Sequence, residues 1–150
     1  MSYRDIYDRL LSEAGAFQAA VEADVVVDEG NLPREIARQA QVLCHWGRLC
    51  VIAEADYLEK KRILEYEVMP LSKIRARAIL KEMGEKTSEA RIDEEVCKDQ
   101  NFRNAKEAVD MAYINLTLFK KVEGAIFQKK DMIQSLNKRQ HVELDSHPRE

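Results

Sequence analysis

The feature that most constrains this chain is a long stretch without a helix breaker, in which an apolar residue recurs at every seventh position. It starts after Gly30 and Asn31, where Pro33 suits the first turn of a helix, and it meets no further proline until Pro70. The recurring residues are Ile36, Leu43, Cys50, Tyr57, Leu64 and Leu71. This spacing keeps them on one stripe of a helix. We therefore predict a helix over residues 33–69 that ends or kinks at the proline.

A helix of about 37 residues is roughly 55 Å long, because each residue adds 1.5 Å. A domain of 150 residues is hardly that wide, so the helix needs a second long helix beside it. Residues 100–138, which follow a capping Asp99, have apolar residues at three-four spacing and predict that partner. We expect antiparallel packing of the two helices. The residues expected to be buried in this packing are Ile36, Leu43, Leu64, Val109, Leu116, Phe119 and Ile126.

Shorter elements fill the rest of the chain. Ser2 can cap a first helix that runs to about Ala23 and is interrupted by Gly15. The β-branched run of residues 24–28 predicts an extended connector or an edge strand. After Pro70, helical spacing resumes up to Gly84, and Thr87 or Ser88 can cap a short helix before Asp99. We predict one helical domain over residues 1–140 and a polar, flexible tail over residues 141–150.

The predicted fold class is all-α, with two long antiparallel helices in a coiled-coil-like hairpin, shorter helices around them, and an oligomeric state. Five glycines and three prolines among 150 residues, with 34% charged residues, are typical of a helical protein. Two long apolar seams expose more apolar surface than one hairpin can cover, so some of it should meet other subunits.

The cellular location expected from the sequence is the cytoplasm. No apolar run has the length of a membrane span, and the first residues lack the pattern of a signal peptide. Three cysteines at unrelated positions favour a reducing compartment.

Charge is unevenly distributed along the chain, although the formal net charge is only −3. Residues 1–30 hold two arginines and seven acids, a balance of −5. Residues 58–81 hold seven basic residues and three acids, a balance of +4, and residues 120–139 hold six and two, again +4. Two basic clusters favour a polyanionic partner, whereas the alternative is that these cations merely solvate outer helix faces.

The sequence contains no recognisable catalytic or metal-binding pattern. Cys44 and His45 would point about 100° apart on a helix, so they cannot chelate one ion together. No Glu-x-x-His pair supports a di-iron bundle, and the five glycines do not form a phosphate-binding loop. We therefore expect a protein that is not an enzyme and that has no cofactor and no metal. A hidden enzyme or metalloprotein site remains an alternative, because catalytic residues can be distant in sequence.

Two stretches of the chain resemble the UvsY recombination mediators of tailed phages. In the first, the segment Asp24-Val25-Val26-Val27-Asp28 is followed by Leu32 and then by Trp46 at the family's spacing. In the second, Ala125-Ile126 is followed by Lys129, Ile133 and Leu136, similar to the close of the family pattern. The chain departs from the family at Gly47 and at Lys130, where the family has other residues. The likeness covers residues 24–139 loosely.

The resemblance implies an all-helical oligomer that binds single-stranded DNA. Such a protein helps to load a RecA-like recombinase onto strands covered by a single-strand-binding protein, in the cytoplasm of the host cell. The family has a Lys-x-Arg pair late in its first long helix that contacts DNA. The nearest matches here are Lys73-Ile74-Arg75 and Arg75-Ala76-Arg77, and this transfer assumes a short insertion because both follow Pro70.

The chemistry of the residues themselves is compatible with this function. Non-specific binding of single strands needs cations along the phosphates and aromatic faces for the bases. The DNA-binding residues expected from the sequence are Lys60, Lys61, Arg62, Lys73, Arg75 and Arg77, with Lys129 and Lys130 as a second surface. Tyr66 is the candidate for base stacking, whereas Tyr57 and Trp46 are expected to pack against the partner helix. The alternative is an oligomeric structural or adaptor protein that binds no nucleic acid.

Overall fold

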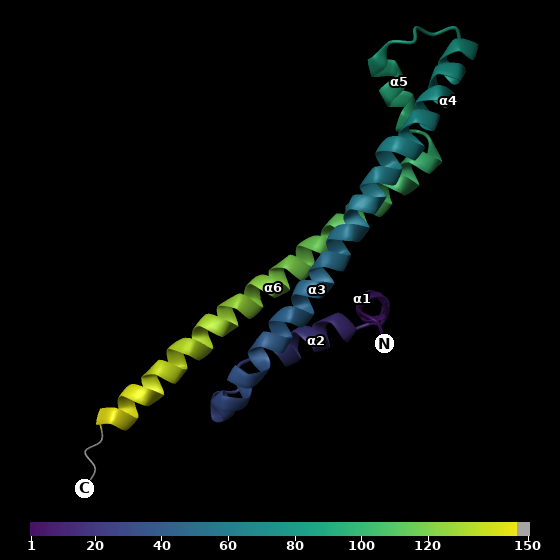
Figure 1. The fold of residues 1–150 in the computed structure, drawn as a ribbon. Coiled ribbons are helices and arrows are strands. Elements are labelled where there is room, and N and C mark those ends of the chain that lie inside the picture. The colour runs from purple at the N-terminus through teal and green to yellow at the C-terminus, as the bar shows by residue number, and fades with distance from the viewer. Residues whose placement is uncertain (147–150) are drawn as a thin grey trace. The chain divides into compact units, whose positions relative to one another are not determined.

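The structure is a computed structural model that describes residues 1–146, and every regular element in this range is a helix (Figure 1). In chain order they are α1 (Tyr3–Ser12), α2 (Ala16–Val25), the 3₁₀ turn η1 (Glu29–Asn31), α3 (Leu32–Arg62), the π-helical segment η2 (Ile63–Val68), α4 (Met69–Glu82), α5 (Glu89–Val96) and α6 (Gln100–Ser146). The prediction of an all-α chain is confirmed.

The chain divides into two compact units, which we describe separately. Unit 1 contains residues 1–52 and the described residues from Leu118 onward, and unit 2 contains residues 53–117. Helices α3 and α6 contribute to both units. The expected single domain over residues 1–140 stays a prediction. Helix α6 continues to Ser146, beyond the expected end near Gln140, and the last four residues of the expected tail lie outside the described range.

Local signals near the N-terminus act as the sequence predicts. The Ser2 hydroxyl accepts a hydrogen bond from the Asp5 N–H, and the Asp5 carboxylate accepts one from the Ser2 N–H, which satisfies two free donors of α1. Gly15, at φ +77°, separates α1 from α2 in a conformation that side chains with a Cβ disfavour. The expected extended run is shorter than predicted, because Asp24 and Val25 belong to α2 and only residues 26–28 connect it to η1.

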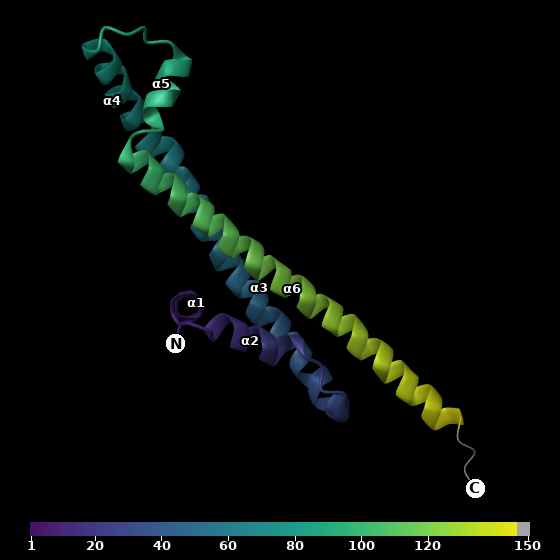
Figure 2. The same ribbon diagram turned by 180° about the vertical axis from the view of Figure 1, so that it is seen from behind.

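Aromatic side chains fill the core of unit 1. Trp46 and Phe119 are fully buried, with ring centroids 6.1 Å apart, and Phe17 from α2 packs edge-on against both rings. Tyr7 from α1 contacts the Phe119 ring at 5.1 Å. The sequence therefore placed Trp46 correctly in the packed interior, and α2 lies against α3 in both views (Figures 1 and 2).

The seven-residue stripe of α3 is not the centre of its buried face. Ile36 is 44% exposed, so its predicted burial is wrong, and Leu43 is only half-buried. The buried face instead follows Leu32, Val42, Trp46, Leu49 and Ala53, and it includes the polar Glu35 and Gln39. Of the other residues expected to be buried, Leu116, Phe119 and Ile126 are buried, while Leu64 and Val109 are half-buried.

In unit 2, α4 and α5 lie side by side, as Figures 1 and 2 both show. Their apolar faces form a small core of Ala76, Leu80, Ile92 and Val96, against which Phe102 packs. The chain leaves α4 at Gly84, at φ +68°, where the Glu85 N–H bonds to the Leu80 carbonyl and the Gly84 N–H to the Lys81 carbonyl. These two bonds form a Schellman motif. Ser88 then caps α5 as predicted.

Pro70 does not end the helix; an end at this residue was one of the two outcomes that the sequence predicted, and the other, a kink, stays a prediction. The preceding η2 is π-helical, and the Met69 N–H donates to the Leu64 carbonyl, five residues earlier. A proline inside an α-helix removes one hydrogen bond and crowds the carbonyl four residues before it. The wider π-turns accommodate that ring, so α4 begins at Met69 directly after η2.

Candidate nucleic-acid interface

Three candidate cations, Lys60, Lys61 and Arg62, occupy the exposed last turn of α3 in unit 2. Arg62 lies 2.9 Å from a Glu59 oxygen and 3.2 Å from a Glu67 oxygen. Hydrogen bonds and charge from Glu59, and then from Glu67, raise the pKa of Arg62, while the hydrogen bond from Arg62 lowers the pKa of Glu59. Arg62 is thus held by its own helix, and Lys61 lies 3.9 Å from Glu65.

Tyr66 is the most exposed aromatic side chain near these cations. It lies on η2, four residues after Arg62, and is 73% exposed. Tyr57, by contrast, packs against Tyr113 with ring centroids 5.6 Å apart, as expected for a residue of the helix seam. An exposed aromatic ring beside cations is the combination that stacks bases and neutralises phosphates.

The next two candidate cations lie on the side of α4 that faces α5. Lys73 Nζ is 3.8 Å from both a Glu89 and an Asp93 oxygen, and Arg77 Nη2 is 3.6 Å from Glu89 Oε1. The two carboxylates, the Lys73 ammonium and the Arg77 guanidinium are about one-third exposed or more. Pairs of this kind contribute little to stability, but they reduce the local positive field of α4.

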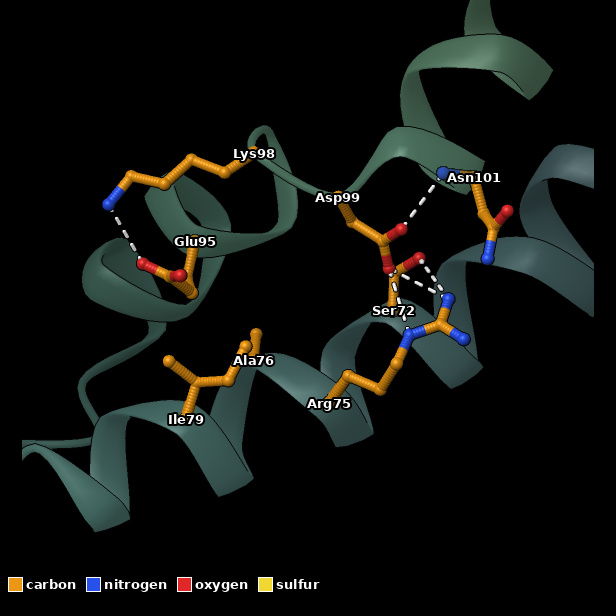
Figure 3. Close-up of a pocket in the computed structure, with 8 residues that line it drawn as sticks. All are labelled: Ser72, Arg75, Ala76, Ile79, Glu95, Lys98, Asp99 and Asn101. Atoms are coloured by element: carbon orange, nitrogen blue, oxygen red, sulfur yellow. Dashed lines mark hydrogen bonds and ion pairs between the residues drawn. The ribbon is translucent and has the colours of Figure 1, made fainter.

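Arg75 binds Asp99, three residues after the end of α5, and lines a pocket of about 320 Å³ (Figure 3). Its Nε and Nη2 lie 3.0 and 2.7 Å from Asp99 Oδ2, and Nη2 lies 3.5 Å from the Ser72 hydroxyl. Burial pushes the pKa of Asp99 upward, but hydrogen bonds from Ser72, Arg75 and the Asn101 N–H outweigh it, so the pKa lies below its ordinary value. Asp99 caps α6 as the sequence predicts, and Arg75 ties that cap to α4.

Lys129, which was predicted to form a second DNA-binding surface with Lys130, is buried. This side chain is only 4% exposed, and its Nζ lies 2.7 Å from Glu35 and 2.8 Å from the Asp24 carbonyl. An ammonium that is buried and paired in this way is not exposed to a phosphate. Lys130 is half-buried beside Ile36 and Leu43, so the two lysines do not form one patch.

Sequence reasoning missed the buried polar cluster around Lys129. The Asp24 carboxylate accepts from the Trp46 indole N–H at 2.9 Å and from Arg38 at 3.4 Å, and the Gln39 amide donates to the Ile126 carbonyl at 3.1 Å. The only signal in the sequence was that Glu35 and Gln39 lie one turn apart on the same flank of the helix as Val42 and Trp46. Residues that carry the resemblance therefore meet in this cluster, where they join α2, α3 and α6.

Other kinds of site are not formed by the described residues. Within residues 1–146, no group of three or more His, Cys, Asp or Glu side chains could hold a metal ion. Across the same range, no helix combines the length and apolarity needed to cross a membrane.

Comparison of the chain with models of protein families, with curated proteins and with solved structures finds no match.

Proposed function

We propose that this chain is a non-enzymatic, oligomeric protein that binds single-stranded DNA and acts as a recombination mediator. In that role it helps to load a RecA-like recombinase onto strands covered by a single-strand-binding protein, inside the cytoplasm. The observation that supports this proposal best is the group of exposed cations at residues 60–62, with the exposed ring of Tyr66 four residues further on. The recombinase and the single-strand-binding protein enter the proposal through the resemblance of two stretches to the UvsY mediators.

The basic segment of residues 60–77 has the length of a short single-stranded site. Residues 60–77 follow one another through α3, η2 and α4, which at 1.5 Å per residue is about 26 Å. The ion pairs with Glu59, Glu89, Asp93 and Asp99 compete with phosphates for these cations. One copy should therefore bind weakly, and several joined copies should bind usefully through multivalency.

The proposal includes antiparallel pairing of α3 with α6. Three contacts within unit 1 support it, because residue numbers rise along α3 while they fall along α6. These contacts are Glu35 with Lys129, Gln39 with the Ile126 carbonyl, and Trp46 with Phe119. Within unit 2, the Tyr57–Tyr113 contact follows the same order.

The decisive experiment is fluorescence anisotropy with a labelled oligothymidylate at several salt concentrations. The affinity should fall with salt at a logarithmic slope of about −0.7 per phosphate contact. Changing both Lys60 and Lys61 to Ala should lower the affinity and reduce the steepness of the slope by the contribution of about two phosphate contacts. Lys86→Ala, at an exposed position of the turn between α4 and α5, is the matched control and should bind like the parent.

Tyr66 provides a second readout, of base stacking rather than charge. Tyr66→Ala should weaken binding by about 1–3 kcal/mol without changing the salt slope, since stacking is largely independent of salt. Tyr66→Phe keeps the aromatic face and should retain the affinity. A Tyr66→Ala protein that binds like the parent would remove this residue from the interface.

The second candidate function is that of an oligomeric structural or adaptor protein without nucleic-acid binding. It is favoured by the ion pairs of Lys73, Arg75 and Arg77 with carboxylates of α5 and Asp99. These pairs offset positive charge on α4 that would otherwise attract phosphates. A flat anisotropy titration at low salt would select this function over DNA binding.

A further inference from the structure

Among the residues that the structure describes, unit 1 has a largely exposed apolar stripe on α3, on the flank between α1 and α6. Its members are Ile36, Ala40, Leu43, Cys44, Gly47 and Val51. Val51 is 66% exposed, and the stripe covers about 23 Å of helix. Neither the aromatic core nor the buried polar cluster uses it, so it is available to another chain.

The spacing of side chains along this stripe is the same in both directions. Successive members are separated by 4, 3, 1, 3 and 4 residues, with a midpoint between Leu43 and Cys44. A second copy of α3 that crosses this midpoint antiparallel places Val51 opposite Ile36, Gly47 opposite Ala40, and Cys44 opposite Leu43. A two-fold interface requires this kind of self-complementary surface.

Hollows on both halves of the stripe fit the side chains that the second copy presents. One hollow, of about 280 Å³, lies beside Ile36, Ala40 and Leu43 and is closed by α6. The other, of about 520 Å³, lies beside Cys44, Gly47 and Val51 and is bordered by Tyr3 of α1. In the antiparallel arrangement, Val51 of the second copy meets the first hollow, and Ile36 of the second copy meets the other.

Gly47 is better explained by such a neighbour than by the fold of its own chain. A Cβ at this position would meet only the Glu123 carboxylate, at an ordinary distance of 3.8 Å. Glycine inside a helix is destabilising relative to alanine, and the packing within unit 1 does not require it. Small residues at Ala40 and Gly47 let two helix backbones approach closely where they face each other.

The charges beside the stripe are also complementary between two copies. The Glu123 carboxylate lies next to Gly47, and Lys130 lines the hollow next to Ala40. Because Gly47 of one copy faces Ala40 of the other, Glu123 of each copy comes opposite Lys130 of its neighbour. Both carboxylate–ammonium pairs form at once by symmetry.

We propose that the α3 stripe is a two-fold interface that joins two copies of this chain antiparallel, with its axis between Leu43 and Cys44. This inference rests on the proposed assembly of several copies but not on DNA binding. It assigns a specific surface, register and charge pairing to that assembly.

Sedimentation equilibrium of the full chain tests the interface directly. The parent should show a mass of at least twice the 17.3 kDa of one chain at micromolar concentration. Val51→Glu should raise the dissociation constant of the two-fold contact at least 100-fold, with unchanged helicity. Val142→Glu is the matched control, because Val142 is 67% exposed on α6 outside the stripe, and it should associate like the parent.

Charge reversal and cross-linking complete the test. Glu123→Lys and Lys130→Glu should each weaken association, and the protein with both changes should recover it. A short bismaleimide should join two chains of a Cys97→Ser protein through Cys44 and should join few chains of a Cys44→Ser protein through Cys97, the other exposed cysteine. A monomeric parent would overturn both the assembly and this interface. An oligomer that is insensitive to Val51→Glu, or that does not cross-link at Cys44, would overturn the interface and leave the assembly intact.

Discussion

Among single residues, Glu35 and Lys129 form a buried ion pair between α3 and α6 in unit 1. Both are almost fully buried, and the distance of 2.7 Å between them is that of a charge-assisted hydrogen bond. A buried pair need not add stability over apolar residues, but leaving one charge without its partner is costly. The pair therefore fixes which face of α3 meets α6 in unit 1, at the expense of Ile36.

Removing one member of this pair gives the first prediction. Lys129→Met should destabilise the protein by about 3–5 kcal/mol, because it leaves the Glu35 carboxylate buried without a cation. Urea denaturation followed by circular dichroism measures this loss.

Combining Lys129→Met with Glu35→Leu should recover most of the lost stability, since no uncompensated charge remains. Lys120→Met, at an exposed position of α6, should change the unfolding free energy by less than about 0.5 kcal/mol. If the double variant were as unstable as Lys129→Met alone, the pair would not be the cause.

Among the elements, the turn between α4 and α5 has a specific backbone requirement. Gly84 adopts a left-handed conformation at φ +68° that closes the Schellman motif, and nothing surrounds its missing Cβ. The requirement is thus conformational and not steric. It brings α5 back along α4 so that Ile92 and Val96 cover Ala76 and Leu80.

Gly84→Ala should therefore destabilise the protein by about 1–2 kcal/mol, the cost of a left-handed conformation for a residue with a Cβ. Gly124 offers the matched comparison, because it lies inside α6 with free space around it. Gly124→Ala should stabilise the protein by about 0.5–1 kcal/mol. Thermal unfolding of the two variants should move in opposite directions.

The cap of α6 leads to a prediction about pH. Because the folded state lowers the pKa of Asp99, its carboxylate stabilises the fold above the ordinary pKa of 3.8. This stabilisation is lost as the pH falls through the lower folded-state value. Acid titration monitored by circular dichroism should show the parent losing stability below about pH 4 more steeply than Asp99→Asn. Equal acid sensitivity of the two proteins would contradict this assignment.

At the scale of the whole molecule, several large apolar side chains remain exposed to solvent. Besides the α3 stripe, they include Leu71 and Ile74 on α4 and Phe127 and Met132 on α6. In the proposed assembly, some of this apolar surface would lie against other chains. Assembly is therefore expected to be part of the stability of the folded state.

An assembled protein should have a melting temperature that depends on its concentration. Raising the concentration a hundredfold should raise the melting temperature of the parent by a few degrees, because association stabilises the folded chains by mass action. Differential scanning calorimetry at several concentrations measures the shift. Val51→Glu should reduce this dependence, whereas Val142→Glu should keep it. A melting temperature of the parent that is independent of concentration would contradict assembly.

The sequence by itself determined the helical class and several helix boundaries. Local chemistry decides these features, since Ser2, Ser88 and Asp99 cap helices with their own side chains and Gly15 and Gly84 adopt positive φ. The burial of Leu116, Phe119 and Ile126 also followed from apolar spacing. Of the candidate site, the sequence located the exposed cations of residues 60–62 and the exposed Tyr66.

Only the tertiary structure decided the rotation of α3 about its axis and the partners of the basic residues. Spacing places Ile36 and Glu35 on neighbouring flanks of one helix, but it cannot tell which flank is buried. Glu35 is buried because it forms an ion pair with Lys129, which lies 94 positions away in the sequence. Likewise, Lys73, Arg75 and Arg77 looked free until the turn at Gly84 brought α5 and its carboxylates alongside. The free energy of a charged side chain depends on what lies across from it, and that is a property of the folded chain rather than of the local sequence.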